Sequence, residues 1–251
     1  MIYFIGAGPG DPELLTIKGK RIIDQADVII YAGSLVNEHV LDSRKPSAAV
    51  YNSAYMTLEE VVEVMKEAAA RGLSVARVHT GDPSIFGAIR EQMDALEQAG
   101  LDYEVVPGVS SFLGAAASLK REYTLPGVSQ TVILTRMEGK TPVPARESIA
   151  SLAAHRATMI IFLSVGMIEK LCELLREHYG ADTPAAVVYK ATWADEKIVR
   201  GTLANLAQKV RDAGITKTAL TIVGDFLGDD YELSRLYDKT FTTEYRKGIS
   251  K

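Results

Sequence analysis

The sequence predicts an α/β protein of two domains, with a mostly parallel sheet in the first and a mixed sheet in the second. The 251 residues exceed the usual single-domain size of about 100 to 150 residues. Short apolar runs alternate with helical patterns in the first half, and a new series of such runs begins after a charged break. Alternation of strand and helix is typical of parallel sheets.

In the first half, two helical patterns at 58–72 and 88–100 each end in a glycine, where a helix C-cap is expected. Five β-rich apolar runs are interleaved with the helical patterns, at residues 3–5, 27–31, 49–52, 74–79 and 103–107. This order predicts strands joined by helical crossovers.

The break KREYTLPGVSQ, residues 120–130, separates the two halves, and we expect domains at 1–120 and 121–251. A second series of strand-like runs follows, at residues 130–136, 158–164, 185–193, 197–201 and 218–225. The short spacing across ATWADEKIVRG predicts a hairpin and therefore a mixed sheet. The polar tail 237–251 is expected on the surface.

Composition excludes several classes of protein. With 47% hydrophobic and 24% charged residues, the chain is typical of a globular protein. A net charge of −4 argues against nucleic acid as a partner, which requires a basic face. No targeting pattern is present and no apolar run approaches the ~18 residues of a membrane helix, so we expect a soluble, cytoplasmic protein. The single Cys172, on the apolar face of a predicted helix, is expected to be a buried hydrophobic residue.

A glycine loop, GAGPGDPE, follows the first apolar run. Its third glycine comes one residue too early for the dinucleotide fingerprint, and Tyr31 stands where an acid should end the second strand. Asp11 and Pro12 replace the lysine and hydroxyl residue of a P-loop. A methyltransferase fold of the G-x-G-x-G type stays a runner-up, although it usually has an acid before the glycines. The loop also fits a simple helix start, with Asp11 as N-cap and Pro12 at N1.

Two further strand ends carry tight loops. Thr80-Gly81 turns the chain before Asp82-Pro83, which repeats the N-cap and N1 arrangement of a helix start. Pro107-Gly108 precedes Ser110 and Ser111 at another predicted helix start. Ligands of open parallel sheets bind outside the carboxyl ends of the strands. The three loops together predict a ligand site at that edge.

The motifs GAGPGDPELLT (6–16), GDPSIFG (81–87) and PGVS (107–110) resemble, in order and spacing, those of the tetrapyrrole (precorrin) methylase family. Further segments resemble the precorrin-4 C-11 methyltransferase branch: YAGSLV (31–36), RVHTGDPSIFGAI (77–89), QTVILTR (130–136), KATWADEKIVR (190–200) and LYDKTFT (236–242). MEGKTPVP (137–144) and the tail are similar to the cobalt-precorrin-4 members.

This resemblance implies transfer of a methyl group from S-adenosylmethionine to carbon 11 of cobalt-precorrin-4, with S-adenosylhomocysteine as product. It implies a homodimer, with the cofactor in the cleft between the domains. The implied cofactor contacts are Pro9, Thr80, Gly81, Asp82, Ile85, Ser110, Ser111, Leu163, Ala191 and Ala219. The glycine loop would then turn tightly and pass Pro9 close to the ligand. Leu163 stands where relatives often have methionine.

In-line methyl transfer needs alignment and no protein nucleophile, so we assign no catalytic residue; Asp82 is a weak candidate. The resemblance places Tyr31, Gly33 and Ser34 at the substrate wall. Arg121, Arg136 and Lys190 are candidates for binding substrate carboxylates, although each fits an ordinary surface charge.

The four histidines, His39, His79, His155 and His178, lack metal-ligand spacing, so we expect no protein-bound metal and a cobalt ion only within the substrate. Two other functions stay open. One is the same cofactor with another acceptor, which includes metal-free precorrin-4, another ring carbon or a protein histidine. The other is a non-catalytic module that binds adenosine ligands.

Overall fold

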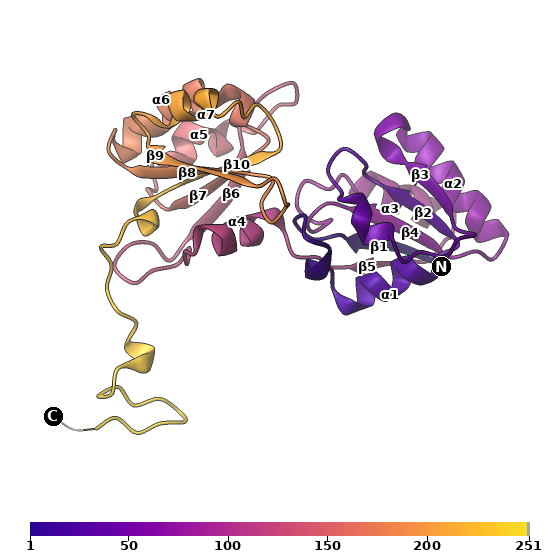
Figure 1. The fold of residues 1–251 in the computed structure, drawn as a ribbon, viewed down its shortest axis with the longest axis horizontal. Coiled ribbons are helices and arrows are strands. Elements are labelled where there is room, and N and C mark those ends of the chain that lie inside the picture. The colour runs from indigo at the N-terminus through magenta and orange to yellow at the C-terminus, as the bar shows by residue number, and fades with distance from the viewer. Residues whose placement is uncertain (250–251) are drawn as a thin grey trace. The chain divides into compact units, whose positions relative to one another are not determined.

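The protein, described here by a computed structural model for residues 1–249, divides into two compact units (Figure 1). The first contains Met1–Ser118 and Lys190–Glu196, and the second contains Leu119–Tyr189 and the chain from Lys197 onward. The short segment 190–196 therefore belongs to the first unit although it lies late in the sequence. We retain the boundary after residue 120 as a proposal for where two folding domains meet.

The first unit is built on a five-stranded sheet of order β3-β2-β4-β1-β5, in which every strand pair is parallel. Its strands are β1 (Ile2–Gly6), β2 (Val28–Tyr31), β3 (Ala49–Asn52), β4 (Val75–His79) and β5 (Tyr103–Val106). β2 and β4 are buried on both faces because helices cover both, which is usual for parallel sheets. The predicted parallel sheet is confirmed.

The helices of the first unit are α1 (Ile17–Gln25), α2 (Leu58–Ala70), α3 (Arg90–Gln98) and α4 (Ser111–Leu119). On one face of the sheet, Ile23 of α1 packs in a core with Ile5 and Val78. On the other face, α2 and α3 pack over Phe4. The glycines expected after α2 and α3, Gly72 and Gly100, have φ angles of 70° and 66°, as left-handed C-caps require.

The second unit has a mixed five-stranded sheet of order β6-β7-β10-β8-β9. Its strands are β6 (Val132–Arg136), β7 (Thr158–Phe162), β8 (Pro184–Tyr189), β9 (Lys197–Thr202) and β10 (Ala219–Val223). β6 and β7 are parallel and the other pairs are antiparallel, which confirms the mixed sheet and the β8–β9 hairpin.

One face of this sheet carries α5 (Ile149–Ala153), α6 (Ile168–Tyr179) and α7 (Leu206–Asp212), as Figure 1 shows. Cys172 of α6 is buried in their common core, as expected, and burial raises the pKa of its thiol to about 11. A thiol in that state is an inert packing group.

Three predicted elements differ from the structure. The strand expected over 185–193 ends at Tyr189, because Lys190 and Thr192 have left-handed φ angles of 47° and 70°.

The helix start predicted at Asp82 is not formed. Asp82 accepts a hydrogen bond from the Ser84 amide, but no helix begins there, and α3 starts only at Arg90. Left-handed residues in the intervening loop, Phe86 at 54° and Ala88 at 49°, prevent a helix. Asp11 likewise caps a short 3₁₀ turn, Pro12–Leu14, and α1 has its own cap, Thr16.

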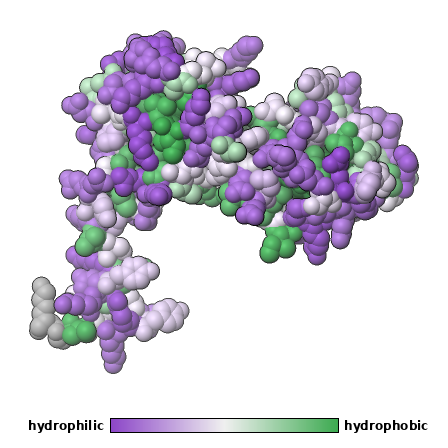
Figure 2. All heavy atoms as spheres, in the orientation of Figure 1, coloured by the Kyte–Doolittle hydropathy of each residue, from purple (hydrophilic) through white to green (hydrophobic). Residues whose placement is uncertain are grey.

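Hydrophilic residues predominate on the face of the molecule shown in Figure 2, with separate hydrophobic patches between them. Residues 237–249 of the tail are largely exposed, as expected, and the last two residues of that prediction lie outside the described residues. Within the described chain, no helix is both long enough and apolar enough to cross a membrane.

Thr57 is the N-cap residue of α2 and forms a capping box with Glu60. The Thr57 hydroxyl accepts from the Glu60 amide at 3.3 Å, and the Glu60 carboxylate accepts from the Thr57 amide at 2.7 Å. Thr57→Ala removes this capping box, and we expect a loss of about 1 kcal/mol in the free energy of unfolding, measured in urea. Thr57→Ser is the matched control. Equal stabilities of the alanine and serine variants would contradict the capping role.

Candidate functional site

Three loops meet at the carboxyl edge of the first sheet, where β4, β1 and β5 are neighbours. A Cβ atom placed on Gly6 would lie 2.5 Å from the Gly81 carbonyl oxygen and 2.6 Å from Cα of Gly108. A Cβ atom on Gly108 would lie 2.3 Å from the same oxygen. Only glycine permits this contact of backbone with backbone. The structure thus brings together the three loops singled out from sequence.

Most backbone donors of the glycine loop are used within the protein. The Ala7 amide donates to the His79 carbonyl at 2.7 Å, and Gly8 and Gly81 exchange two backbone hydrogen bonds of 3.2 and 2.8 Å. The Asp11 amide donates to the Thr192 hydroxyl at 3.0 Å, while Pro9 has no N–H. A phosphate cradle needs free backbone N–H groups. This loop is therefore poorly suited to phosphate.

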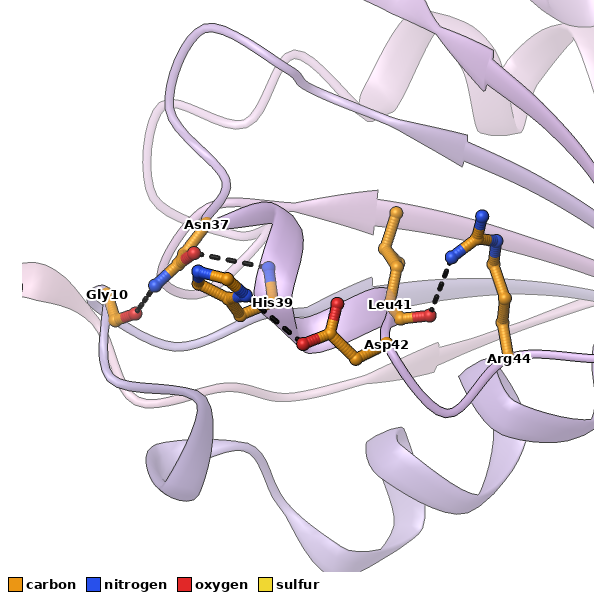
Figure 3. A network of polar contacts seen from close by, with 6 residues as sticks. All are labelled: Gly10, Asn37, His39, Leu41, Asp42 and Arg44. Carbon is orange, nitrogen blue, oxygen red and sulfur yellow. Dashed lines mark hydrogen bonds and ion pairs between the residues drawn. The ribbon is translucent and has the colours of Figure 1, made fainter.

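Two side chains that the sequence analysis did not single out hold the carbonyls of this loop. The Asn37 side chain donates to the Gly10 carbonyl at 2.8 Å (Figure 3), and the Trp193 indole donates to the Pro9 carbonyl at 3.0 Å. Asn37 is itself oriented by the His39 amide, which donates to its side-chain oxygen at 3.2 Å. The available signals were their positions, since Asn37 directly follows YAGSLV and Trp193 lies within KATW.

Asp82 joins the second loop to the third. One carboxylate oxygen accepts from the Gly108 amide at 2.8 Å, and the other accepts from the Ser84 amide at 2.9 Å and the Ser84 hydroxyl at 2.5 Å. Partial burial by itself would raise the pKa of Asp82, but the hydrogen bonds from Ser84 and Gly108 outweigh it and hold the pKa below its usual range. Asp82 is therefore an ionised crosslink at neutral pH, which makes it a poor proton acceptor.

Thr80, Ile85, Ser110 and Ser111, also predicted to contact the cofactor, lie beside this crosslink or in the adjoining loops, whereas Ala191 lies in the 190–196 segment. A Cβ atom on Gly81 would lie 3.4 Å from Cα of the buried Ser110. α4 begins at Ser111, and the Ile85 amide donates to the Asp82 carbonyl at 3.2 Å. Thr80 precedes Gly81 and is half-buried. Ala191 is buried in the 190–196 segment, beside the residue that holds Asp11.

Leu163 and Ala219 lie in the second unit. The antiparallel register pairs Thr221 of β10 with Ile161 of β7, so Ala219 at the start of β10 lies toward the end of β7, which Leu163 directly follows. Leu163 is 68% exposed and has a left-handed φ of 54°. The Ser164 hydroxyl fixes this bend, since it donates to the Phe162 carbonyl at 2.6 Å and accepts from the Met137 amide at 2.8 Å. A strained, exposed leucine at a strand end is typical of a ligand site.

The predicted substrate wall follows β2. The Tyr31 hydroxyl donates to Glu38 at 2.7 Å, and this bond, with burial, raises the pKa of Tyr31. A Cβ atom on Gly33 would lie 2.2 Å from the Asn52 side-chain nitrogen, and Ser34 is exposed. β2 is a parallel neighbour of β4, so this group occupies the same edge of the sheet as the three loops.

Each of the three basic candidates for substrate binding already makes a hydrogen bond or an ion pair within the protein. Arg136 donates to the carbonyls of its own following loop, at Met137, Thr141 and Pro142. Arg121 pairs with Asp229 at 2.9 Å, and Lys190 pairs with Asp195 at 2.7 Å. Their role in binding substrate stays a prediction.

The buried imidazole of His79 should make the stability of the protein depend on pH. It is buried beside Arg77, its Nε2 has no hydrogen-bond partner, and burial, with the Arg77 charge, lowers its pKa from 6.5 to about 3. Between those values the unfolded chain binds a proton that the native chain does not, so stability falls as pH falls. The loss should be about 1.4 kcal/mol per pH unit.

His79→Gln should therefore lose about 2 kcal/mol less than the wild type between pH 7 and pH 5, measured by urea unfolding. The exposed His155→Gln is the control. Parallel pH profiles for wild type and His79→Gln would refute this account.

The sequence is similar to proteins of known function. The family model described as Tetrapyrrole (Corrin/Porphyrin) Methylases matches residues 1–207. The cobalt-precorrin-4 C(11)-methyltransferase of Methanocaldococcus jannaschii is 58% identical over 252 residues, covering 100% of this chain and 97% of the relative. The precorrin-4 C(11)-methyltransferase of Pseudomonas aeruginosa is 48% identical over 248 residues, covering 98% and 99%.

Solved structures of similar fold come from the same family. A cobalt precorrin-4 methyltransferase, described as a cobalamin biosynthetic enzyme, superposes with a TM-score of 0.89 at 48% identity, covering 91% of this chain and 96% of that chain. The uroporphyrin-III C-methyl transferase of Thermus thermophilus, solved with S-adenosylhomocysteine, has a TM-score of 0.75 at 30% identity, covering 90% and 92%. The motifs, the two sheets and these matches agree, and the chain belongs to the tetrapyrrole methylase family.

Proposed function

We propose that this protein is an S-adenosylmethionine-dependent methyltransferase that adds a methyl group to carbon 11 of cobalt-precorrin-4 in cobalamin biosynthesis, releasing S-adenosylhomocysteine. The observation that carries the proposal is the 58% identity, over the whole chain, with a relative of that name. That match covers 100% of this chain, so it includes the KATW segment (190–193) and the tail as well as the first sheet.

The chemistry of the glycine loop supports this cofactor. S-adenosylmethionine is an adenosine compound without phosphate, and the loop offers few free backbone donors because Ala7, Gly8 and Asp11 already donate within the protein. We propose that Pro9, Thr80–Asp82, Ile85, Ser110, Ser111 and Ala191 of the first unit contact the cofactor, and that Leu163 and Ala219 of the second unit do so as well.

The cofactor would supply an activated methyl group, and the protein would supply alignment. Proximity and orientation can be worth ~7–11 kcal/mol in such a displacement, without any protein nucleophile. Asp82, held ionised by Ser84 and Gly108, would steady the second and third loops while the reacting groups meet. We assign it a positioning role and assign no general base.

We also propose that cobalt enters only as part of the substrate, and that the enzyme is a cytoplasmic homodimer. Among residues 1–249, no three His, Cys, Asp or Glu side chains form a group suited to a metal ion, which supports the first point. Metal-free precorrin-4 is the second candidate substrate, favoured by the 48% identity with the Pseudomonas aeruginosa relative.

The test is incubation of the pure protein with methyl-labelled S-adenosylmethionine and, in parallel, cobalt-precorrin-4 or precorrin-4. We expect one labelled methyl on carbon 11 of the cobalt compound, identified by mass spectrometry and carbon NMR. Faster transfer to precorrin-4 would favour the second candidate, and label on another carbon would place the protein in another branch of the family. No transfer, with calorimetric binding of S-adenosylhomocysteine retained, would support a binding module instead.

A substitution at Gly33 would test the proposed substrate wall after β2. Gly33→Val would collide with the Asn52 side chain, whose oxygen accepts from the Gly33 amide at 3.2 Å, and would displace the loop after β2. We expect turnover to fall on the order of 10- to 100-fold, because small misplacements are costly, while calorimetric binding of S-adenosylhomocysteine stays within about twofold. Ala70→Val, at an exposed position of α2, is the control. Equal loss of turnover and binding would place Gly33 in the cofactor site instead.

A further inference from the structure

Trp193 is the one tryptophan of the chain, and it lies in the 190–196 segment against the glycine loop. We propose that Trp193, supported by Thr192, is a positioning residue that fixes Pro9 and Gly10 for cofactor binding. The inference rests on the proposed function, since it assigns a task to that same site. All the contacts that carry it lie within the first unit.

The contacts join segments more than 180 residues apart. The indole N–H donates to the Pro9 carbonyl at 3.0 Å, and the Thr192 hydroxyl accepts from the Asp11 amide at 3.0 Å. A Cβ atom on Gly10 would lie 2.0 Å from the indole Cδ1, so the ring fills the space that a side chain would take. Trp193 and Thr192 therefore hold both sides of Gly10.

The same segment packs on α4. A Cβ atom on Gly114 would lie 2.9 Å from Cβ of Pro9 and 3.1 Å from the Thr192 methyl carbon. Pro9 and Thr192 thus lie together over a helix position that has room for no side chain. Pro9 is consequently held from its carbonyl by Trp193 and from its ring by α4.

The segment is itself held in an unfavourable backbone conformation. Lys190 and Thr192 have left-handed φ angles, which for residues other than glycine persist only when the surroundings impose them. Glu196 does so, because its carboxylate accepts from the Thr192 amide at 2.6 Å and from the Ser118 hydroxyl at 2.5 Å. The Lys190 ammonium, paired with Asp195, lies 4.9 Å from the centre of the Trp193 ring. Such strain is concentrated at functional sites.

The consequence for binding follows from the glycines. Gly8 is already held by its two hydrogen bonds with Gly81, and Asn37 holds the Gly10 carbonyl, so the remaining freedom lies at the Pro9 carbonyl and at the Asp11 amide on the two sides of Gly10. The Trp193 and Thr192 contacts remove that freedom before a ligand arrives, and preorganisation of this kind strengthens binding. Loss of the indole N–H should weaken binding without removing any direct ligand contact.

The test compares Trp193→Phe, which keeps an aromatic ring but lacks the N–H, with the wild type. We expect calorimetry to show about tenfold weaker binding of S-adenosylhomocysteine. The KM for S-adenosylmethionine should rise by a similar factor with kcat within about twofold, because the loss is one of ground-state binding. Urea unfolding checks that the variant is folded. Thr192→Ala should weaken binding in the same way, and Thr192→Ser, which keeps the hydroxyl, should restore it.

Fluorescence gives a second readout. Wild-type Trp193 emission should change on titration with S-adenosylhomocysteine, with the calorimetric Kd. In the double variant Trp193→Phe/Tyr55→Trp, the single tryptophan stands at a position where the tyrosine is 87% exposed, and its emission should not respond.

The outcomes separate the two proposals. If the wild type binds S-adenosylhomocysteine and folded Trp193→Phe and Thr192→Ala bind it equally well, the positioning role is wrong and the proposed function stands. If the wild type does not bind it, the proposed cofactor is wrong and this inference falls with it.

Discussion

The close approach of three backbones at the carboxyl edge of the first sheet is the constraint on which the candidate site depends. Gly6, Gly81 and Gly108 contact one another without intervening side chains, because a Cβ atom on Gly6 or Gly108 would lie well inside van der Waals distance of another backbone. The parallel order β4-β1-β5 makes this possible, since it brings three strand ends to one place. Within the first unit, Asp82, Ser110 and Thr80 lie directly beside that junction.

The junction also determines what kind of ligand the edge can accept. Once the loops exchange hydrogen bonds with one another and with Thr192, few backbone donors remain for an anion. Asp82 adds a half-buried negative charge at this edge of the sheet, and hydrogen bonds from Ser84 and Gly108 stabilise it. The glycine-rich turn after the first strand is therefore a compact loop whose hydrogen bonds are mostly made within the protein, unlike those of a phosphate-binding loop.

Several non-glycine residues with left-handed backbones lie beside predicted ligand contacts. Phe86 and Ala88 follow Ile85, Lys190 and Thr192 flank Ala191, and Leu163 is itself such a residue. Two of these backbones are fixed by printed neighbours: the Ser164 hydroxyl donates to the Phe162 carbonyl across Leu163, and the Glu196 carboxylate accepts from the Thr192 amide. The local cost is offset by packing and hydrogen bonding nearby, as is usual where a backbone must present a residue outside a regular element.

The sequence by itself determined the two α/β units, all ten strands and the three convergent loops, because apolar periodicity and glycine or proline turns are local signals. It also indicated the family, through motifs that keep their order and spacing. Only the tertiary structure decided that β8 stops at Tyr189, that Asp82 crosslinks two loops instead of starting a helix, and that Asn37 and Trp193 hold the glycine loop. These features depend on contacts between residues far apart in the chain, and no local propensity encodes which distant partner will satisfy a given carbonyl.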